Sequence, residues 1–240
     1  MIILKTSIRN FIRRIGFDFV RYQPATHPLA RRKKILDTYN ISLVLDVGAN
    51  IGQYGEQLRE IGYKKKIVSF EPQKAAYELL RNCAKKEKLW EVHNCALGDK
   101  EESAKINIAA NSMSSSLLEM LPSHFKSAPE SEYVSQEEIQ VKTLDSVFPM
   151  LASQTDRVYL KIDTQGLEKN VLNGAENSLK LIDAIQLEMS LIPLYRDEPL
   201  FDEMYQFLYQ KGYRLIALET GFTDKKTGEL LQFDGIFHKI

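Results

Sequence analysis

The 240-residue chain has few of the residues that build disulfide-stapled or metal-binding domains. It contains two cysteines, Cys83 and Cys95, and four histidines. Two cysteines cannot form a disulfide framework, and no pair of these residues stands at the spacing of a metal or redox motif. Such low cysteine use is typical of a reducing compartment, so we predict a cytoplasmic location.

The sequence also lacks a long apolar run. No stretch approaches the roughly eighteen apolar residues of a membrane-spanning helix. The opening residues, MIILKTSIRNFI, lack the apolar stretch of a signal peptide. What the chain does have is 44% hydrophobic residues, enough to bury one sizeable core. One α/β domain is therefore the simplest expectation.

Net charge is absent overall, because 32 basic residues balance 32 acidic ones, but the charges are unevenly placed. Residues 1–34 carry nine Lys and Arg against one Asp, a net of +8, so residues 35–240 carry −8. We therefore divide the chain into a basic N-terminal arm, 1–34, and a domain, 35–240. The acidic domain and the lack of interleaved aromatic and basic residues argue against a nucleic-acid partner.

The arm has the pattern of an amphipathic helix. Its apolar residues fall near one helical face, with arginines elsewhere; they are Ile3, Leu4, Ile8, Phe11, Ile12, Ile15 and Phe19. Such a helix can lie on an anionic membrane, which would make the protein membrane-associated. It can equally pack on the domain or on a second subunit of an oligomer, and the sequence leaves these alternatives open.

Strand-like and helix-like stretches alternate along the domain. We expect helices near 53–61, 75–86, 167–180 and 199–211, and a long loop-like insertion over 112–138. The alternation predicts a mostly parallel sheet with helices on both faces. The last two strands are joined by a polar turn without a helix, so they can pair antiparallel.

The stretch LVLDVGANIGQY, residues 43–54, is a buried strand that breaks into a turn with two glycines. A dinucleotide-binding turn needs glycine at its first, third and sixth positions, but Asn50 and Gln53 stand at the second and third of these places. A P-loop is excluded because no Lys-Ser or Lys-Thr closes the turn. The turn therefore predicts a ligand without phosphates, which leaves an NAD-binding oxidoreductase as a remote alternative.

Seven motifs, in order over residues 35–240, resemble those of the FkbM family of S-adenosylmethionine-dependent methyltransferases. They are DVGANIGQYG, SFEPQ, NCALGD, SMSSSL, LKIDTQGLEKNVLNGA, IQLEMSLIPLY and LLQFDGIF. The resemblance implies an α/β, Rossmann-like class I methyltransferase fold with a seven-stranded, mostly parallel sheet and an antiparallel C-terminal strand. It also implies S-adenosylmethionine as cofactor and O-methylation of a hydroxyl on a sugar, a glycan or glycolipid, or a secondary metabolite.

S-adenosylmethionine has an amino-acid end, a sulfonium and a nucleoside, and the turn offers contacts for these parts. Gly48 and Gly52 allow the chain to turn tightly against the methionine moiety. Asp46 can accept a hydrogen bond from the ammonium group or order the turn, and Asn50 can bond the ligand or its own backbone. Glu71, at the end of the next strand, can accept from both ribose hydroxyls.

The remaining cofactor-binding candidates come from neighbouring motifs. Ala96 and Leu97 offer a main-chain N–H and an apolar wall for adenine, and Asp99 is a candidate acceptor for its amino group. Tyr54 follows the glycine turn, and Pro72 follows the proposed ribose contact. These two residues complete the predicted cofactor-binding set.

Asp163 and Glu188 are the predicted catalytic residues, because each stands at the end of an expected parallel strand. The Asp163 carboxylate should face the cofactor's methyl group, either as the base that takes the acceptor's proton or as a contact to the cofactor. Glu188 can share the base and orienting roles. The two carboxylates could instead hold a divalent ion such as Mg²⁺, but no metal site is part of the prediction.

An enzyme is not the only reading of these motifs. A catalytically silent nucleoside-binding module of the same fold is the alternative, although the retention of Glu71 and Asp163 beside the turn favours the enzyme. The expected partner is a small-molecule or glycan acceptor, whose identity the sequence does not reveal. His124 and the serines at 114–116 lie in the insertion, and long insertions often serve as lids or substrate loops.

Overall fold

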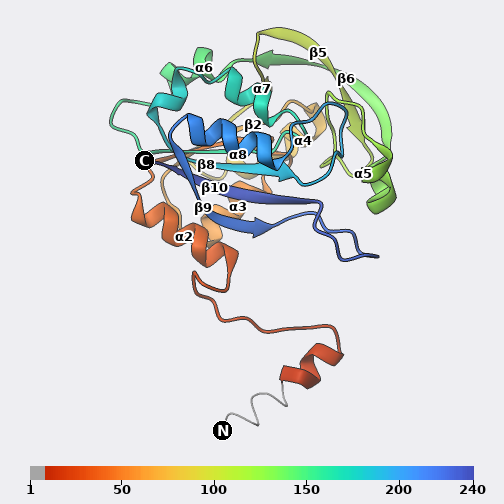
Figure 1. The fold of residues 1–240 in the computed structure, drawn as a ribbon. Coiled ribbons are helices and arrows are strands. Elements are labelled where there is room, and N and C mark those ends of the chain that lie inside the picture. Colours follow the sequence, from red (N-terminus) through yellow and green to blue (C-terminus); the bar gives the residue numbers. More distant parts are fainter. Residues whose placement is uncertain (1–8) are drawn as a thin grey trace.

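The computed structural model describes residues 9–240, which fold around a seven-stranded sheet (Figure 1). The strand order is β3-β2-β1-β7-β8-β10-β9, and β10 alone runs antiparallel to its neighbours. The strands are β1 (Leu43–Val47), β2 (Lys66–Phe70), β3 (Trp90–His93), β7 (Val158–Ile162), β8 (Ile182–Ser190), β9 (Tyr213–Thr220) and β10 (Gln232–Lys239). This arrangement confirms the predicted Rossmann-like α/β fold, including its antiparallel C-terminal strand.

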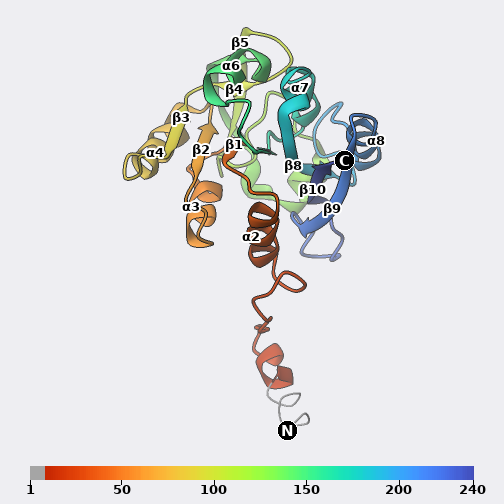
Figure 2. The same ribbon diagram turned by 90° about the vertical axis from the view of Figure 1, so that its left-hand side faces the viewer.

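Helices cover both faces of the sheet (Figure 2). They are α2 (Pro28–Thr38), α3 (Gln53–Glu60), α4 (Lys74–Ala84), α6 (Leu144–Leu151), α7 (Glu168–Asn173) and α8 (Phe201–Gln210). Alternate residues of β1 point to opposite faces, so Leu45 packs in the cluster with α6, α7 and α8, while Val44 packs in the cluster with α2, α3 and α4. All five residues of β1 are buried, as expected of a central parallel strand.

The structure also contains a second, three-stranded sheet. It has the order β4-β6-β5, with β4 (Ala96–Leu97), β5 (Glu102–Ala109) and β6 (Tyr133–Lys142). The predicted loop over 112–138 is therefore wrong in its second half. That half contains the helix α5 (Pro122–Ser127), the 3-10 turn η1 (Pro129–Ser131) and the start of β6, which is extended because it pairs antiparallel with β5 as far as Ala109.

The predicted helix over 167–180 is also interrupted. α7 ends at Asn173, and the chain resumes as the 3-10 turn η2 (Ser178–Leu181). The Asp145 carboxylate accepts hydrogen bonds from the backbone N–H groups of Asn177 (3.0 Å) and Ser178 (2.7 Å), which fixes the break. Asp145 lies in α6, a helix that the sequence reading missed, so a contact between distant segments decides this boundary.

The N-terminal arm departs from the single predicted helix. Residues 9–14 are helical, the chain turns at Gly16 with φ +88°, and Phe19 lies outside any helix. Ile3, Leu4 and Ile8 of the predicted apolar face lie outside the described residues. The proposed boundary at residue 34 falls within α2. Among residues 9–240, no helix has the length and apolar content to cross a membrane, and the cytoplasmic location stays a prediction.

A buried ion pair fastens α2 to the sheet. The Arg32 guanidinium donates to the carboxylate of Glu219 in β9, and both side chains are at most 7% exposed. Arg32 also donates to Gln57 Oε1 at 3.2 Å and lies over the Tyr54 ring, with its central carbon 4.7 Å from the ring centroid. The position of α2 therefore depends on compensated buried charge as well as on the packing of Leu36.

We predict that Arg32→Met lowers the free energy of unfolding by about 3–5 kcal/mol, because it leaves the Glu219 carboxylate buried without its partner. Urea denaturation measures the change. The matched control is Lys33→Met on the same helix, whose pair with Asp37 is exposed and should contribute less than about 1 kcal/mol. Adding Glu219→Leu to Arg32→Met should recover part of the loss. Equal effects of Arg32→Met and Lys33→Met would contradict the anchoring role.

Candidate functional site

A cavity of about 780 Å³ opens at the carboxyl ends of the parallel strands, where doubly wound α/β folds bind their ligands. Its walls come from the turns after β1, β2 and β7, from β8 and the facing ends of β9 and β10, from the second sheet, and from α2. Of the predicted site residues, those that line it are Gly48, Asn50, Tyr54, Glu71, Pro72, Ala96, Leu97, Asp163 and Glu188. Binding by these residues stays a prediction, but the fold brings them together.

The glycine turn owes its shape to three left-handed residues. Gly48, Asn50 and Gly52 have φ values of +77°, +47° and +101°. A side chain on Gly48 would place its Cβ 1.8 Å from the carbonyl oxygen of Asp163, so β1 and β7 approach closely here. Asn50 tolerates the left-handed conformation because its Oδ1 accepts from the backbone N–H of Ile51 at 2.9 Å.

Glu71 ties the end of β2 to this turn. Its Oε2 accepts from the backbone N–H of Asn50 at 2.7 Å, and its Oε1 accepts from the backbone N–H of Gln73 at 2.8 Å. A carboxylate has about four lone-pair positions, so two remain for a ligand. Burial raises the pKa of Glu71 to about 7, although both backbone donors favour the charged form.

Two predicted cofactor contacts lie behind the cavity wall. Asp46 is fully buried, accepts from Ser69 Oγ at 3.1 Å and pairs with Lys161 Nζ at 3.3 Å. Of the two roles considered for it, the geometry supports ordering the turn. Gly52 also lies outside the lining, where an added Cβ would come 3.1 Å from Leu80 Cδ1. It begins α3 and allows that helix to pack closely.

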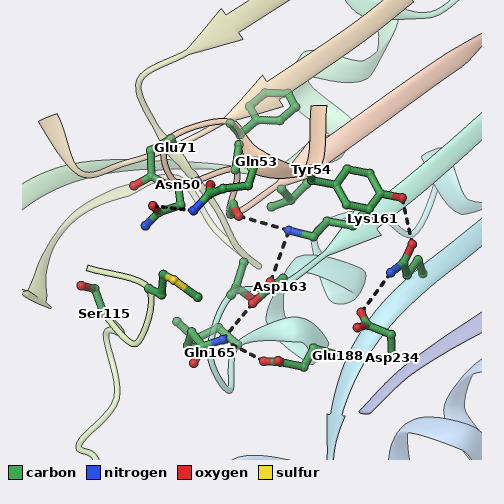
Figure 3. Close-up of a pocket in the computed structure, with 18 of the residues that line it drawn as sticks. Asn50, Gln53, Tyr54, Glu71, Ser115, Lys161, Asp163, Gln165, Glu188 and Asp234 are labelled. Atoms are coloured by element: carbon green, nitrogen blue, oxygen red, sulfur yellow. Dashed lines mark hydrogen bonds and ion pairs between the residues drawn. The ribbon is translucent and has the colours of Figure 1, made fainter. Parts of the chain in front are cut away.

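Lys161 connects the turn to β7. Its buried ammonium group lies 3.3 Å from Asp46 Oδ1 and donates to the carbonyl oxygen of Gly48 at 3.2 Å. It also lies 3.4 Å from Asp163 Oδ2 (Figure 3). Burial by itself would lower the pKa of Lys161, but the two carboxylates outweigh it and raise the pKa above its usual value. Lys161 therefore stays charged and links β1 with β7.

Asp163 and Glu188 are joined by a side chain whose role the sequence reading left open. Gln165 Nε2 donates to Asp163 Oδ1 and to Glu188 Oε2, both at 2.8 Å (Figure 3). Its Oε1 accepts from the Tyr195 hydroxyl at 2.8 Å, which fixes which way the amide faces. Gln165 has φ +55°, an uncommon value for a residue other than glycine. The only sequence signal was its place in LKIDTQG.

Glu168 holds the loop that carries Gln165. Its Oε1 accepts from the backbone N–H of Thr164 at 2.7 Å, and its Oε2 accepts from that of Gly166 at 3.1 Å. Burial raises the pKa of Glu168 to about 7. The acidic residue of the first helical turn thus satisfies N–H groups that would otherwise lack partners.

The two predicted catalytic carboxylates lie in different surroundings. The Asp163 side chain is 35% exposed and reaches the cavity. Burial, followed by the negative charges of Asp163 and Asp234, raises the pKa of Glu188 well above its usual value. Glu188 Oε2 accepts from both Gln165 and Gln232. Glu188 is therefore the more enclosed of the two carboxylates, and Asp163 is the more accessible one.

Beyond these carboxylates, the cavity wall contains polar residues that the sequence reading did not single out. Gln186 Oε1 accepts from the hydroxyls of Tyr54 (2.8 Å) and Tyr159 (2.9 Å), and its Nε2 donates to Asp234 Oδ1 at 3.1 Å. Gln186 and Asp234 stand in IQLEMS and QFDGIF, two motifs that carry the family resemblance. Only the fold brings them to one end of the cavity, together with Arg32 and Glu219.

The opposite end of the cavity is apolar. Ala96 and Leu97 lie there, and the other apolar lining residues at this end include Phe70, Ile106, Leu117, Ile139 and Leu167. Asp99 does not line the cavity and accepts from Asn170 Nδ2 at 3.3 Å, so an adenine contact from its side chain is not supported. Ser115 and Ser116 of the insertion do line it, whereas Ser114 does not.

The remaining candidates lie away from the cavity. His124 is buried in α5 against Tyr195 and Phe222, and burial lowers its pKa to about 4, which suits a structural residue. Cys95 is buried and Cys83 partly buried, and both thiols are free. Within residues 9–240 no three His, Cys, Asp or Glu side chains cluster as a metal site would require. Binding of a metal by Asp163 and Glu188 stays untested.

Residues 46–215 match the family described as "Methyltransferase FkbM domain". This match covers most of the chain. The protein belongs to the FkbM methyltransferase family. Among curated proteins, none matches the chain significantly.

Solved methyltransferase structures are similar to this family member only at low identity. Magnesium protoporphyrin IX methyltransferase from Synechocystis PCC 6803, with bound S-adenosylmethionine, is 9% identical, with a TM-score of 0.46 over 98% of this chain and 97% of that one. An rRNA methylase from Streptococcus thermophilus is 12% identical, with a TM-score of 0.48 over 89% and 97%. These distant likenesses carry no inference about the ligand or substrate of this protein.

We predict that Gly48→Ala destabilises the protein by at least about 1–3 kcal/mol more than Gly62→Ala does. Both glycines are left-handed, at φ +77° and +86°, so both variants carry the same kind of backbone strain. Only at position 48 does the new Cβ meet a backbone atom, the Asp163 carbonyl oxygen, since nothing lies within 4 Å at Gly62. Urea denaturation of the two variants measures the difference. Equal losses would show that the close approach of β1 and β7 is not a constraint.

Proposed function

We propose that this methyltransferase transfers a methyl group from S-adenosylmethionine to a hydroxyl of a small-molecule or glycan acceptor. The observation that carries the proposal is the placement of Asp163, an accessible carboxylate in the cavity, beside the glycine turn. The cavity volume, about 780 Å³, lies within the range of about 300–1,000 Å³ typical of small-molecule sites.

The cavity's two ends suit the two ends of S-adenosylmethionine. Adenine fits the apolar end around Ala96 and Leu97, and the ribose hydroxyls can donate to the free lone pairs of Glu71. The methionine moiety then lies along the turn from Gly48 to Asn50. Held in this way, the cofactor would supply its methyl group on the side of the cavity where Asp163 lies. The polar end beyond Asp163, with Gln186 and Asp234, is left for the acceptor.

In the proposed reaction, an acceptor hydroxyl donates its proton to the Asp163 carboxylate while its oxygen attacks the methyl carbon. Bound S-adenosylmethionine would supply the methyl group, so that an O–C bond would form as the S–C bond breaks and S-adenosylhomocysteine, a neutral thioether, would be the second product. Alignment of oxygen, methyl and sulfur can remove roughly 7–11 kcal/mol of the barrier, and proton removal adds to this. Glu188, whose pKa is raised by burial, orients the acceptor or the Gln165 bridge.

We expect Asp163→Asn to keep cofactor affinity and to lower the single-turnover rate by roughly 10²–10⁴-fold, because the amide keeps the shape but cannot take a proton. Rapid-quench methyl transfer and calorimetry with S-adenosylmethionine separate the two quantities. Asp99→Asn is the matched control, since Asp99 lies outside the cavity lining. A normal rate in Asp163→Asn would remove Asp163 from the chemistry, and loss of affinity alone would make it a cofactor contact.

Cofactor affinity should fall as the pH is lowered through about 7, where Glu71 titrates. Ribose hydroxyls donate to the charged carboxylate, so binding lowers the pKa of Glu71 and releases its proton. Below the pKa that release opposes binding, and affinity decreases by up to about tenfold per pH unit. Above it the dependence levels off.

Calorimetric titration with S-adenosylmethionine on both sides of this pH measures the effect. Glu71→Gln should bind more weakly at high pH and lose most of the pH dependence, whereas Glu101→Gln, at an exposed position, should keep it. An identical pH profile in Glu71→Gln would contradict the assignment of Glu71 to the ribose.

A further inference from the structure

The N-terminal arm exposes an unusual amount of apolar surface. Residues 9–22 project away from the folded body, as both ribbon views show (Figures 1 and 2). Phe11, Phe17 and Phe19 are 65%, 67% and 76% exposed, and Val20 and Tyr22 are more than half exposed. A group of exposed apolar side chains on a protein surface indicates a site of interaction with another molecule or a membrane.

The same segment is basic. Residues 9–22 contain four arginines and one aspartate, a net charge of +3. Arg9 and Arg13 pair with Asp18 at 2.9 Å and 2.7 Å. Arg14 and Arg21 form no ion pair within residues 9–240 and face solvent. Exposed aromatic side chains beside unpaired cationic groups are complementary to a bilayer, which has an apolar interior and, where its lipids are acidic, anionic head groups.

We propose that residues 9–22 dock the protein on an anionic lipid surface. Two signals act together here, apolar side chains that enter the interfacial region and arginines that meet lipid phosphates. A second copy of the chain offers this arm a less suitable hollow. The hollow outside the main cavity is lined by Arg59, Lys64 and Lys88 against one carboxylate, Glu87, so its net positive charge would repel a basic arm.

The arm leads directly into the cavity wall. After residue 22 the chain reaches His27, Pro28 and Leu29, which line the cavity with Arg32 of α2. Docking of the arm therefore connects the lipid surface to the polar end of the cavity through α2. This connection favours an acceptor hydroxyl that is attached to a lipid rather than one free in solution. The inference about the acceptor rests on the function proposed above.

Vesicle sedimentation of the full chain tests the docking without using the enzymatic activity. One set of vesicles is phosphatidylcholine alone, and the other is equal parts phosphatidylcholine and phosphatidylglycerol. The protein should pellet with the anionic vesicles and bind the neutral ones far more weakly. Arg14→Gln with Arg21→Gln should weaken anionic binding by about 30-fold, since each basic residue near such a surface contributes about 1 kcal/mol.

A second pair of variants separates apolar insertion from charge. Phe17→Ser with Phe19→Ser should reduce vesicle binding by at least about tenfold. The matched control is Val134→Ser with Met150→Ser, which removes two side chains that are 63% and 76% exposed on the body. Equal losses in the two double variants, or equal binding to both kinds of vesicle, would overturn the proposal. A dimer in solution that Phe17→Ser with Phe19→Ser abolishes, without vesicle binding, would assign the arm to a second copy.

Methyl transfer distinguishes this inference from the proposed function. If the variants do not alter vesicle binding, the docking proposal is wrong, and the proposed methyl transfer to a soluble hydroxyl acceptor is unaffected. If the protein binds vesicles but transfers no methyl group to any hydroxyl, the proposed reaction and the lipid-attached acceptor are wrong. The docking proposal would then still hold.

Discussion

The buried ammonium group of Lys161 is the interaction on which the site depends. It contacts Asp46 at the end of β1, Asp163 after β7 and the carbonyl oxygen of Gly48, so one charge fixes three parts of the cavity. Without it, Asp46 would be a fully buried carboxylate with only Ser69 as a donor. Such an uncompensated charge is strongly destabilising, so the position of the glycine turn and that of the loop after β7 depend on each other.

Gln165 extends the same arrangement from Asp163 to Glu188. One amide group donates to two carboxylates, and the Tyr195 hydroxyl sets its orientation. The donors reduce repulsion between the carboxylates, while burial leaves Glu188 with a raised pKa. Two chemically similar side chains thus have different surroundings, as paired carboxylates in enzymes commonly do, and the proposed reaction gives them different tasks. The left-handed backbone of Gln165 is held by Glu168 and by the packing of Gly166 near Tyr195.

The cavity is closed from two sides by segments with different origins in the chain. The second sheet supplies apolar side chains at one end, and α2 supplies Arg32 at the other. The Arg32 guanidinium is buried, paired with Glu219 and stacked over Tyr54, which holds α2 against the sheet. α2 therefore both lines the cavity and carries the N-terminal arm. The proposed lipid surface and the proposed acceptor end are therefore joined through one helix.

The sequence by itself determined the alternating strands and helices, the sheet they form, and the residues at strand ends, because these follow from local patterns of burial and from glycine turns. Asp163, Glu188 and Glu71 were found this way. Only the tertiary structure showed that Asp46 lies behind the wall, that Gln165 joins two carboxylates, and that residues 133–138 form a strand. Each of these depends on partners far along the chain, Lys161, Glu188 and β5, and no local pattern records which distant groups will satisfy a buried charge or an unpaired strand edge.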